Sequence, residues 1–407
     1  MNEERYEENP QNVTEAEMVV AIPSYREAKL IAYPTSQAAL GLKRYFRDKK
    51  YVLINCDNNS DDGTKEAFFG AETEDVPQIY ISTPPGVRGK GNNFRNLFRK
   101  VLELKAKAVV VVDADLKSIT PQWIKHLGEP LFNDFGYVSP LYVRHKYDGT
   151  ITNSIAYPMT RALYGRRVRQ PIGGDFGFSG DLARIYLASP TWTEAVSQFG
   201  IDIWMTTLAM NNNIPICQAY MGRPKIHKPK DPGADLGPMF AQVVGTIFDL
   251  MLHNTGYWMQ VKWSKPTAIY GFGLGEVEMP PPVKVSEGKL AQNFRDGFDK
   301  YQDIWRKVLT PDNMNKVLEI GQLPDEHFDF PTQLWAKLLY DFASSYHKEV
   351  ADKDEVLASL IPLYFGKTLS YVRKTARMSV QQAEEFIENE CMVFEETKPY
   401  LLERWGA

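Results

Sequence analysis

Four consecutive valines end in two carboxylates in the sequence VVVVDADL, residues 109–116. A run of β-branched residues of this length is typical of a strand that is buried on both faces, as in a parallel sheet. Parallel sheets bind their ligands beyond the carboxyl ends of the strands. The sequence therefore predicts an α/β fold and places Asp113 and Asp115 at the ligand-binding edge of its sheet.

Asp113 and Asp115 are candidate ligands of a divalent cation. Side chains two residues apart in a strand share a face, so both carboxylates can approach one ion if the chain turns at Ala114. Two hard oxygen ligands suit Mg²⁺ or Mn²⁺ carrying a diphosphate. An isolated Asp-x-Asp is a weak signal, and solvated carboxylates at a strand end are the structural alternative.

Three further apolar segments, 18–22, 51–55 and 79–82, have the pattern of strands. They alternate with helical patterns over about 36–47 and 92–104. This alternation predicts βαβ units with right-handed crossovers. The first half is therefore expected to be Rossmann-like, with the loops after the first, second and fourth strands meeting where the strand order reverses.

The chain of 407 residues is long enough for two domains with separate cores. A flexible acidic tail is expected over 1–17, followed by an α/β domain over 18–284. After the prolines at 280–282 the apolar residues recur at helical spacing. This pattern predicts a helical C-terminal domain over 285–407.

Composition excludes several classes of protein. A net charge of −4 gives no general attraction to nucleic acid or to anionic membranes. No apolar run reaches the length of a membrane span, and the acidic N-terminus does not have the pattern of a signal peptide. The three cysteines are widely separated, without disulfide or metal-ligand spacing, so a cytoplasmic location is expected.

A glycine-rich, basic loop precedes the second predicted helix, with the sequence PPGVRGKGNN over residues 84–93. Its glycines would let the backbone approach a ligand closely. Arg88 and Lys90 add positive charge at a helix N-terminus, which itself favours anions. The loop predicts a phosphate-binding site, although it lacks the Ser or Thr that follows the lysine of a Walker loop. A flexible surface turn is the structural alternative.

His227 is a candidate third metal ligand beside Asp115, because it lies in a basic loop before Pro229. A satisfied surface or core histidine is the more frequent case, so residue type alone does not decide between the two. The basic neighbours of this histidine are Arg223, Lys225, Lys228 and Lys230.

Two other segments carry glycines or a carboxylate at candidate site positions. Residues 170–175, QPIGGD, would place backbone close to a small ligand, with a bulged hairpin as the alternative. Asp202 stands at the start of an apolar helix. It can cap that helix or point into the site.

In their order and spacing these features resemble the retaining glycosyltransferases of the GT-A fold. The resemblance is closest to the mannosylglycerate synthase family and more distant to the glucosyl-3-phosphoglycerate synthases. It covers most of the chain, including the helical C-terminal part. The matching features are Pro23 to Glu27, Asp57, residues 89–91, 113–115, 170–174 and 200–202, and His227.

The resemblance implies a role for each matching residue. Asp202 would hold the transferred sugar or the acceptor hydroxyl and Lys90 would contact the donor diphosphate, and these two are the predicted catalytic residues. The predicted donor-binding residues are Pro23, Glu27, Asp57, Lys90, Asp113 and Ala114. The predicted acceptor-binding residues are Arg144, Asp148, Thr152, Ile172 and Gly173. The predicted ligands of a Mg²⁺ or Mn²⁺ cofactor are Asp115, His227 and Asp113.

The acceptor side departs from the pattern of the family. Asp175 stands where the family often has Glu, and residues 144–149 differ from the relatives between the matched positions. Within this segment, Lys146 would suit a phosphorylated acceptor. The acceptor and the nucleotide base therefore stay open.

The resemblance thus implies a metal-dependent, retaining transferase of mannose or glucose, with GDP-mannose, GDP-glucose or UDP-glucose as donor and D-glycerate as the favoured hydroxy-acid acceptor. The product would be a charged glycoside of the compatible-solute type, such as mannosylglycerate or glucosylglycerate. Two alternatives stay open. One is a nucleotidyltransferase, and the other is a nucleotide-sugar-binding protein without turnover. Assembly into a homo-oligomer is also left open.

Overall fold

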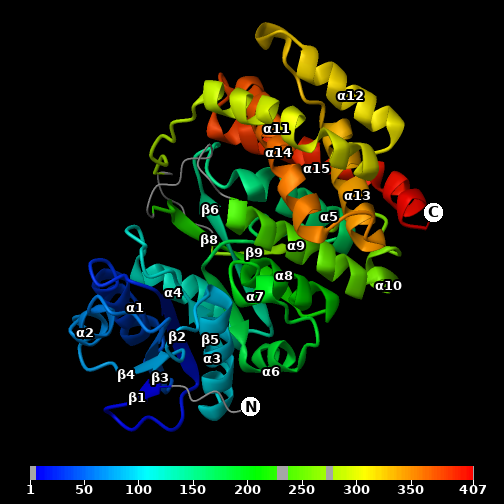
Figure 1. Ribbon diagram of the computed structural model, residues 1–407. Helices are drawn as coiled ribbons and strands as arrows, with labels where there is room; N and C mark the ends of the chain where they lie inside the picture. Colours follow the sequence, from blue (N-terminus) through cyan, green and yellow to red (C-terminus); the bar gives the residue numbers. More distant parts are fainter. Residues whose placement is uncertain (1–5, 227–236, 272–277, 407) are drawn as a thin grey trace. The chain divides into compact units, whose positions relative to one another are not determined.

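The computed structural model describes residues 6–226, 237–271 and 278–406. Within these residues one mixed sheet has nine strands in the order β1-β4-β3-β2-β5-β7-β6-β8-β9 (Figure 1). Its strands are β1 (Tyr6–Glu8), β2 (Met18–Ser24), β3 (Tyr51–Asp57), β4 (Gln78–Ser82), β5 (Ala108–Val111), β6 (Tyr137–Val143), β7 (Phe176–Ser179), β8 (Ile216–Pro224) and β9 (Ala268–Tyr270).

Helices occupy most of the remaining chain. None of the described helices combines the length and the apolar character that crossing a bilayer requires. The helices up to β8 are α1 (Ala32–Tyr45), α2 (Thr64–Phe69), α3 (Lys90–Glu103), α4 (Pro121–Gly128), η1 (Glu129–Phe132), η2 (Thr152–Ala156), α5 (Tyr157–Tyr164), α6 (Gly180–Ala188), α7 (Glu194–Ser197) and α8 (Ile201–Asn211). Those that follow are α9 (Gly237–His253), α10 (Thr255–Trp258), α11 (Glu287–Val308), α12 (Pro311–Gln322), η3 (Asp325–His327), α13 (Thr332–Lys348), α14 (Lys353–Thr375) and α15 (Val380–Gly406).

The strands β4, β3, β2 and β5 run parallel to one another, and the chain order reverses between β2 and β5. This reversal is the switch point that the sequence predicts, and the expected α/β fold with a helical C-terminal region is confirmed. Beyond β5 the sheet continues through β7, which is antiparallel to both β5 and β6. The carboxyl ends of β2, β3 and β5 therefore meet at one edge.

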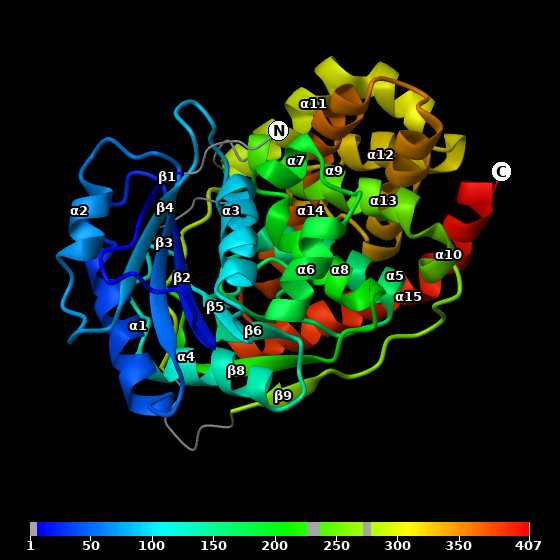
Figure 2. The same cartoon turned by 90° about the horizontal axis from the view of Figure 1, so that it is seen from below.

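Apolar side chains bury both faces of the parallel part of the sheet. Helices α1 and α4 cover one face and α3 covers the other (Figure 2). The core beneath α1 and α4 contains Val20 and Val110 from the strands and Leu42 and Trp123 from the helices, all with no exposed surface. Because neither face of these strands reaches solvent, polar groups collect at the strand ends.

Part of the segment expected as a flexible tail is a strand. Tyr6–Glu8 forms β1, which pairs antiparallel with the edge of β4. Its acidic residues bind lysines, with Glu7 2.5 Å from Lys100 and Glu8 2.6 Å from Lys65. The acidic side chains thus attach this segment to the α/β fold, which composition alone did not indicate.

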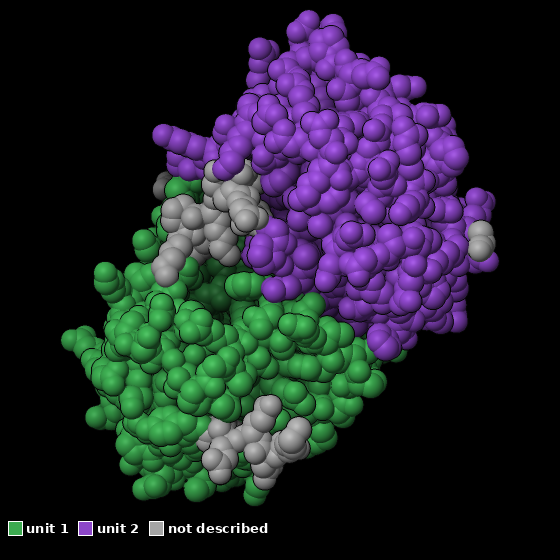
Figure 3. Space-filling view, in the orientation of Figure 1, with its two compact units in different colours: residues 1–144, 168–229, 267–281 green, residues 145–167, 230–266, 282–407 purple. Residues whose placement is uncertain are grey.

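The chain divides into two compact units, coloured separately in Figure 3. Unit 1 comprises residues 1–144, 168–229 and 267–281 and contains the sheet, whereas unit 2 comprises 145–167, 230–266 and 282–407. Two segments that lie inside the expected 18–284 range therefore cluster with the helical C-terminal residues. The domain limits at 17 and 284 remain a prediction, and they do not separate these two segments.

Buried ion pairs fix how the helices of unit 2 pack. The Arg161 side chain is 2% exposed and its Nε lies 2.5 Å from Glu395. Lys367, which is 1% exposed, pairs with Glu390, which is 6% exposed. An unpaired charge at these depths costs several kcal/mol, so each pair disfavours other arrangements of its helices.

The start of α6 provides a test of the backbone packing in unit 1. A Cβ on Gly180 would lie 1.9 Å from the carbonyl oxygen of Ala106. Gly180→Ala should therefore lower the free energy of unfolding by about 1–3 kcal/mol, the usual cost of overpacking. Gly256→Ala is the matched control, because a Cβ there has no atom within 4 Å, and it should change stability by less than about 0.5 kcal/mol. Equal urea midpoints for the two variants would contradict the packing.

Candidate functional site

Lys90 opens helix α3 at the carboxyl edge of the parallel strands. The preceding Gly89 has φ of 124°, a conformation that favours glycine. A Cβ at Gly89 would lie 2.3 Å from Ser197 O, and one at Gly91 would lie 1.9 Å from Val196 O. These two glycines are therefore required by packing against the backbone of helix α7. The sequence suggested a different reason, close approach to a ligand.

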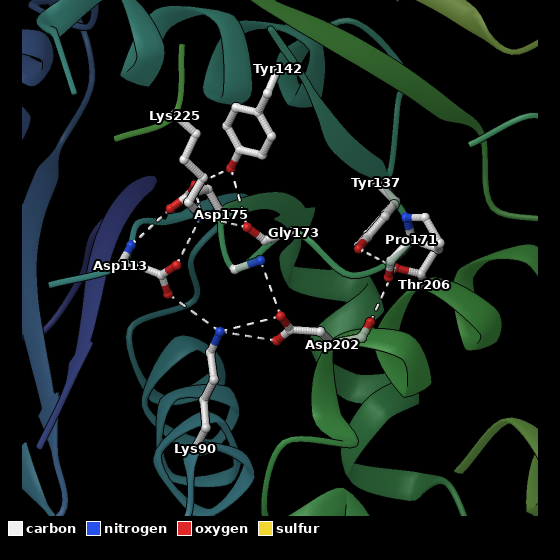
Figure 4. Close-up of polar contacts among 11 residues, drawn as sticks. Lys90, Asp113, Tyr137, Tyr142, Pro171, Gly173, Asp175, Asp202, Thr206 and Lys225 are labelled. Carbon is white, nitrogen blue, oxygen red and sulfur yellow. Dashed lines mark hydrogen bonds and ion pairs between the residues drawn. The ribbon is translucent and has the colours of Figure 1, made fainter. Parts of the chain in front are cut away.

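The ammonium group of Lys90 lies between two carboxylates (Figure 4). Its Nζ is 3.3 Å from Asp113 Oδ1 and 3.1 Å from Asp202 Oδ1. The backbone N–H of Gly174 donates to Asp202 Oδ2 over 3.1 Å. Asp202 does not cap its own helix, because the N-cap of α8 is Gly200 without a side-chain bond. Three candidates from separate segments, Lys90, Asp113 and Asp202, thus meet at one point.

A second ammonium group, that of Lys225, approaches Asp113 from the opposite side (Figure 4). Lys225 directly follows β8, and its side chain is 3% exposed. Its Nζ is 2.9 Å from Asp113 Oδ2 and 2.8 Å from Asp175 Oδ2, and it donates to Gly173 O over 2.6 Å. Asp175 also accepts from the hydroxyl of Tyr142 and, over 2.9 Å, from the backbone N–H of Asp113.

Lys90, Asp113, Asp175, Asp202 and Lys225 are called the lysine–aspartate cluster below. Burial alone would lower the pKa of Lys90 and of Lys225, but the neighbouring carboxylates outweigh it and hold each pKa above its usual value. Burial raises the pKa of Asp175, an effect that Lys225 opposes. The cluster holds three carboxylates and two ammonium groups, and the nearby Arg144 guanidinium adds a third positive charge that acts on Lys225.

Gly174 allows the loop of residues 170–175 to pack against Asp113. Its φ is 81°, and a Cβ there would lie 2.1 Å from Asp113 Oδ2. On the other side of the loop, Pro171 O accepts from Thr206 Oγ1 of α8 over 2.8 Å (Figure 4). The close backbone approach that the sequence predicts here is therefore an approach to a carboxylate of the protein itself.

Asp57 organises the loops that follow β2 and β3. It is 1% exposed, and its carboxylate accepts four hydrogen bonds. The donors are Ser24 Oγ at 2.6 Å, Ser60 N at 2.6 Å, Ser60 Oγ at 2.8 Å and Tyr80 Oη at 2.9 Å. The predicted contact from Asp57 to a nucleotide base would therefore have to replace one of these bonds.

The other predicted donor-binding residues lie at the same edge of the sheet. Pro23 is buried as the penultimate residue of β2, and Ala114, which is 4% exposed, follows β5. Glu27 is half-buried in the loop after β2, where its backbone N–H donates to Thr64 Oγ1 over 2.9 Å. These residues border the switch point, where parallel sheets bind their ligands.

The described residues contain only part of the predicted metal site. Both carboxylate oxygens of Asp113 face ammonium groups, which favours the half-buried Asp115 as the metal ligand of this pair. His227 lies outside the described residues. Within residues 6–226, 237–271 and 278–406 no group of three or more His, Cys, Asp or Glu could hold a metal ion. The half-buried carboxylate of Asp115, a hard oxygen donor just beyond the carboxyl end of β5, is the observation that fits a divalent cation.

The predicted acceptor-binding residues come from both units. Arg144 ends the first segment of unit 1, whereas Asp148 and Thr152 belong to unit 2. Thr152 is 2% exposed and begins the π-helical turn η2. Ile172 and Gly173 lie in unit 1, in the loop of residues 170–175, where Gly173 O accepts a hydrogen bond from Lys225.

Lys146 is bound to backbone rather than available for a phosphate. Its Nζ donates to the carbonyl oxygens of Thr375 at 2.6 Å, Ala376 at 3.1 Å and Met378 at 2.8 Å, all within unit 2. An ammonium group has three donors, and these contacts use all of them. The suggestion that Lys146 would receive a phosphorylated acceptor is therefore wrong for this conformation.

Lys225 and Tyr142 belong to the site although the sequence did not reveal them as members. The sequence marks Lys225 only as one of several basic neighbours of His227. Its position directly after an apolar strand is the signal that could have been used, because a lysine buried there needs a carboxylate partner. The identity of that partner depends on tertiary packing, since Asp113 is 112 residues away in the chain.

No protein-family model matches the sequence, and no curated protein matches it. Solved structures of glucosyl-3-phosphoglycerate synthase from Mycobacterium tuberculosis are similar at 21% identity, over 58% of this chain and 79% of that chain. The TM-score is 0.44 for its complex with Mn²⁺, UDP and glucosyl-3-phosphoglycerate. It is 0.44 for the complex with Mg²⁺ and UDP, and 0.41 for the complex with Mn²⁺, UDP-glucose and phosphoglyceric acid. A similarity of this size carries no argument about the activity of this chain.

Substituting Gly174 tests the contact between its loop and Asp113. Gly174→Ala adds both a strained φ and a clash with Asp113, whereas Gly222→Ala adds strain alone, because Gly222 has φ of 74° and no atom within 4 Å of a Cβ. The free energy of unfolding of Gly174→Ala should be at least about 1 kcal/mol lower than that of Gly222→Ala. Equal free energies of unfolding for the two variants would contradict a close contact between Gly174 and Asp113.

Proposed function

We propose that this chain is a metal-dependent retaining glycosyltransferase of the GT-A type. It would transfer mannose or glucose from a nucleotide diphosphate sugar to a small hydroxy acid, with D-glycerate as the favoured acceptor. The observation that carries the proposal is the position of the Lys90 ammonium, at the N-terminus of α3 and between Asp113 and Asp202. A helix N-terminus with a lysine attracts a diphosphate, and an adjacent carboxylate can receive the hydroxyl groups of a sugar.

Each member of the site has a role in this proposal. Lys90 would bind the diphosphate and stabilise the negative charge that develops on it as the glycosidic bond breaks. Asp202 would hold the transferred sugar or the acceptor hydroxyl, and Asp113 would receive the ribose. A divalent cation held by Asp115 and His227 would supply further neutralisation of the leaving diphosphate.

Retention fits the charge pairing of the lysine–aspartate cluster. Asp113, Asp175 and Asp202 each contact an ammonium group, which weakens a carboxylate as a nucleophile. Without a carboxylate nucleophile, the acceptor hydroxyl would attack from the side of the leaving group. The departing phosphate would then take its proton.

A transfer assay tests the proposed function. UDP-glucose, GDP-glucose and GDP-mannose are each incubated with D-glycerate, phosphoglycerate or glycerol in the presence of Mn²⁺, and the products are separated by chromatography. The expected products are a nucleoside diphosphate and a glycoside of glycerate. Chelation should abolish turnover, and Lys90→Ala should lower kcat by about 100-fold or more, because the charge on the diphosphate loses its cation. Release of pyrophosphate would instead identify a nucleotidyltransferase, and full activity in excess chelator would exclude the metal.

Asp202 should compete with a diphosphate for Lys90. Asp202→Asn removes this competing charge, so the variant should bind a nucleoside diphosphate about three- to tenfold more tightly while losing turnover. The nucleoside diphosphate lacks the sugar, so the loss of a sugar contact does not affect this measurement. Asp181→Asn is the control by titration calorimetry, since Asp181 is 89% exposed and pairs only with Arg184 among the ion pairs described. Weaker binding by the Asp202 variant would contradict the competition.

Arg144 should recognise the carboxylate of the acceptor. Its guanidinium stacks on the ring of Tyr142 at 5.1 Å from the centroid, an orientation that lysine cannot reproduce. Arg144→Lys should raise the acceptor KM about tenfold or more and leave the donor KM unchanged. Glycerol, which has no carboxylate, should be a poor acceptor for the wild type. Equal rates with glycerol and glycerate would refute the hydroxy-acid assignment but not transfer itself.

A further inference from the structure

The Lys225 ammonium is the most completely bound cation of the lysine–aspartate cluster. Its three contacts, to Asp113 Oδ2, Asp175 Oδ2 and Gly173 O, are 2.9, 2.8 and 2.6 Å long. They use all three protons of the ammonium group, and the side chain is 3% exposed. Lys225 therefore has no donor left for a substrate in this arrangement.

The three acceptors of Lys225 belong to two separate parts of unit 1. Asp113 follows β5, whereas Gly173 and Asp175 lie in the loop that precedes β7. One buried ammonium group thus joins the predicted donor-binding carboxylate to the predicted acceptor-binding loop. Tyr142 strengthens the junction, because its hydroxyl donates to Asp175 and its ring lies 5.1 Å from Lys225 Nζ.

We propose that Lys225 is a positioning residue for the reaction, and this inference rests on the proposed function. It would act through Asp113 and Gly173 by holding the donor side and the acceptor side of the site at a fixed separation. The reaction needs this fixed separation because transfer occurs only when the acceptor hydroxyl lies within reach of the anomeric carbon of the donor sugar. A displacement of about 1 Å can cost about 100-fold in rate.

Loss of stability alone cannot reveal a positioning role. Removing one partner of any buried ion pair destabilises a protein, because the other charge is left unpaired. Unit 2 offers a matched control in Lys367, which is 1% exposed and pairs with the buried Glu390. Lys367→Met and Lys225→Met each remove an ammonium group from a buried ion pair, and only the second should affect the site.

Steady-state kinetics at a temperature where each variant is folded form the first test. Lys225→Met should lower kcat by about 100-fold and raise the acceptor KM at least about tenfold. Its affinity for a nucleoside diphosphate with Mn²⁺ should fall less than the acceptor KM rises, because Lys90 remains in place and only the contact from Asp113 to the ribose is loosened. Lys225→Arg, which keeps the charge, should recover much of the activity. It also serves as the test variant if Lys225→Met does not fold, with a raised acceptor KM as the expected result.

A purely structural role for Lys225 predicts a different result. It would lower only the concentration of active enzyme and leave both KM values unchanged. The double variant Lys225→Met with Asp175→Asn separates the two roles further, because it removes the carboxylate that the first substitution leaves unpaired. The double variant should regain stability but not activity. Normal KM values in Lys225→Met, or activity that returns together with stability, would overturn the proposal.

Hydrogen exchange provides a test that does not depend on activity. The amide of Asp113 is bound to Asp175 Oδ1 at 2.9 Å, and the amide of Gly174 is bound to Asp202 Oδ2 at 3.1 Å. In the full-length Lys225→Met variant, residues 112–116 and 171–176 should exchange at least about tenfold faster, and in Lys367→Met they should not. Unchanged exchange would overturn the positioning role. Absence of transfer in the wild type would instead refute the proposed function, and the exchange rates would still decide the role of Lys225.

Discussion

The carboxylate of Asp113 lies between two ammonium groups, and the arrangement of the site depends on this pairing. Lys90 approaches it from helix α3 at 3.3 Å and Lys225 from the end of β8 at 2.9 Å. The two cations differ in how tightly they are held. Lys225 is 3% exposed with contacts of 2.6–2.9 Å, whereas Lys90 is 17% exposed with contacts of 3.1–3.3 Å. The site therefore combines a tightly bound, buried cation with one that is more exposed and held by longer contacts.

Glycines provide the backbone approaches that bring these charges together. Gly91 lets the start of α3 pack against the backbone at Val196, and Gly174 lets its loop reach Asp113. A Cβ at either position would overlap an oxygen atom of the protein at about 2 Å, far inside van der Waals contact. The glycine-rich segments thus set the distances between Lys90, Asp113 and Asp202.

The sequence was sufficient for the fold class, and three of its candidate site residues, Lys90, Asp113 and Asp202, lie together in the structure. Hydrophobic periodicity is a local property, and it predicted the parallel strands around residues 109–112 and the switch point at their carboxyl ends. It could not show that Lys225 is paired with Asp113, because that contact joins residues 112 apart and depends on how β5 and β8 are placed. For the same reason it gave no sign that 145–167 clusters with the helical residues of unit 2.

The most direct test of the account is a crystal structure of the protein with a nucleoside diphosphate and Mn²⁺. The account predicts that Lys90 Nζ lies about 3 Å from a diphosphate oxygen and has left Asp202, while Lys225 keeps its contacts to Asp113, Asp175 and Gly173. A structure in which the diphosphate binds elsewhere and Lys90 remains on Asp202 would contradict the assignment of this cluster as the donor site.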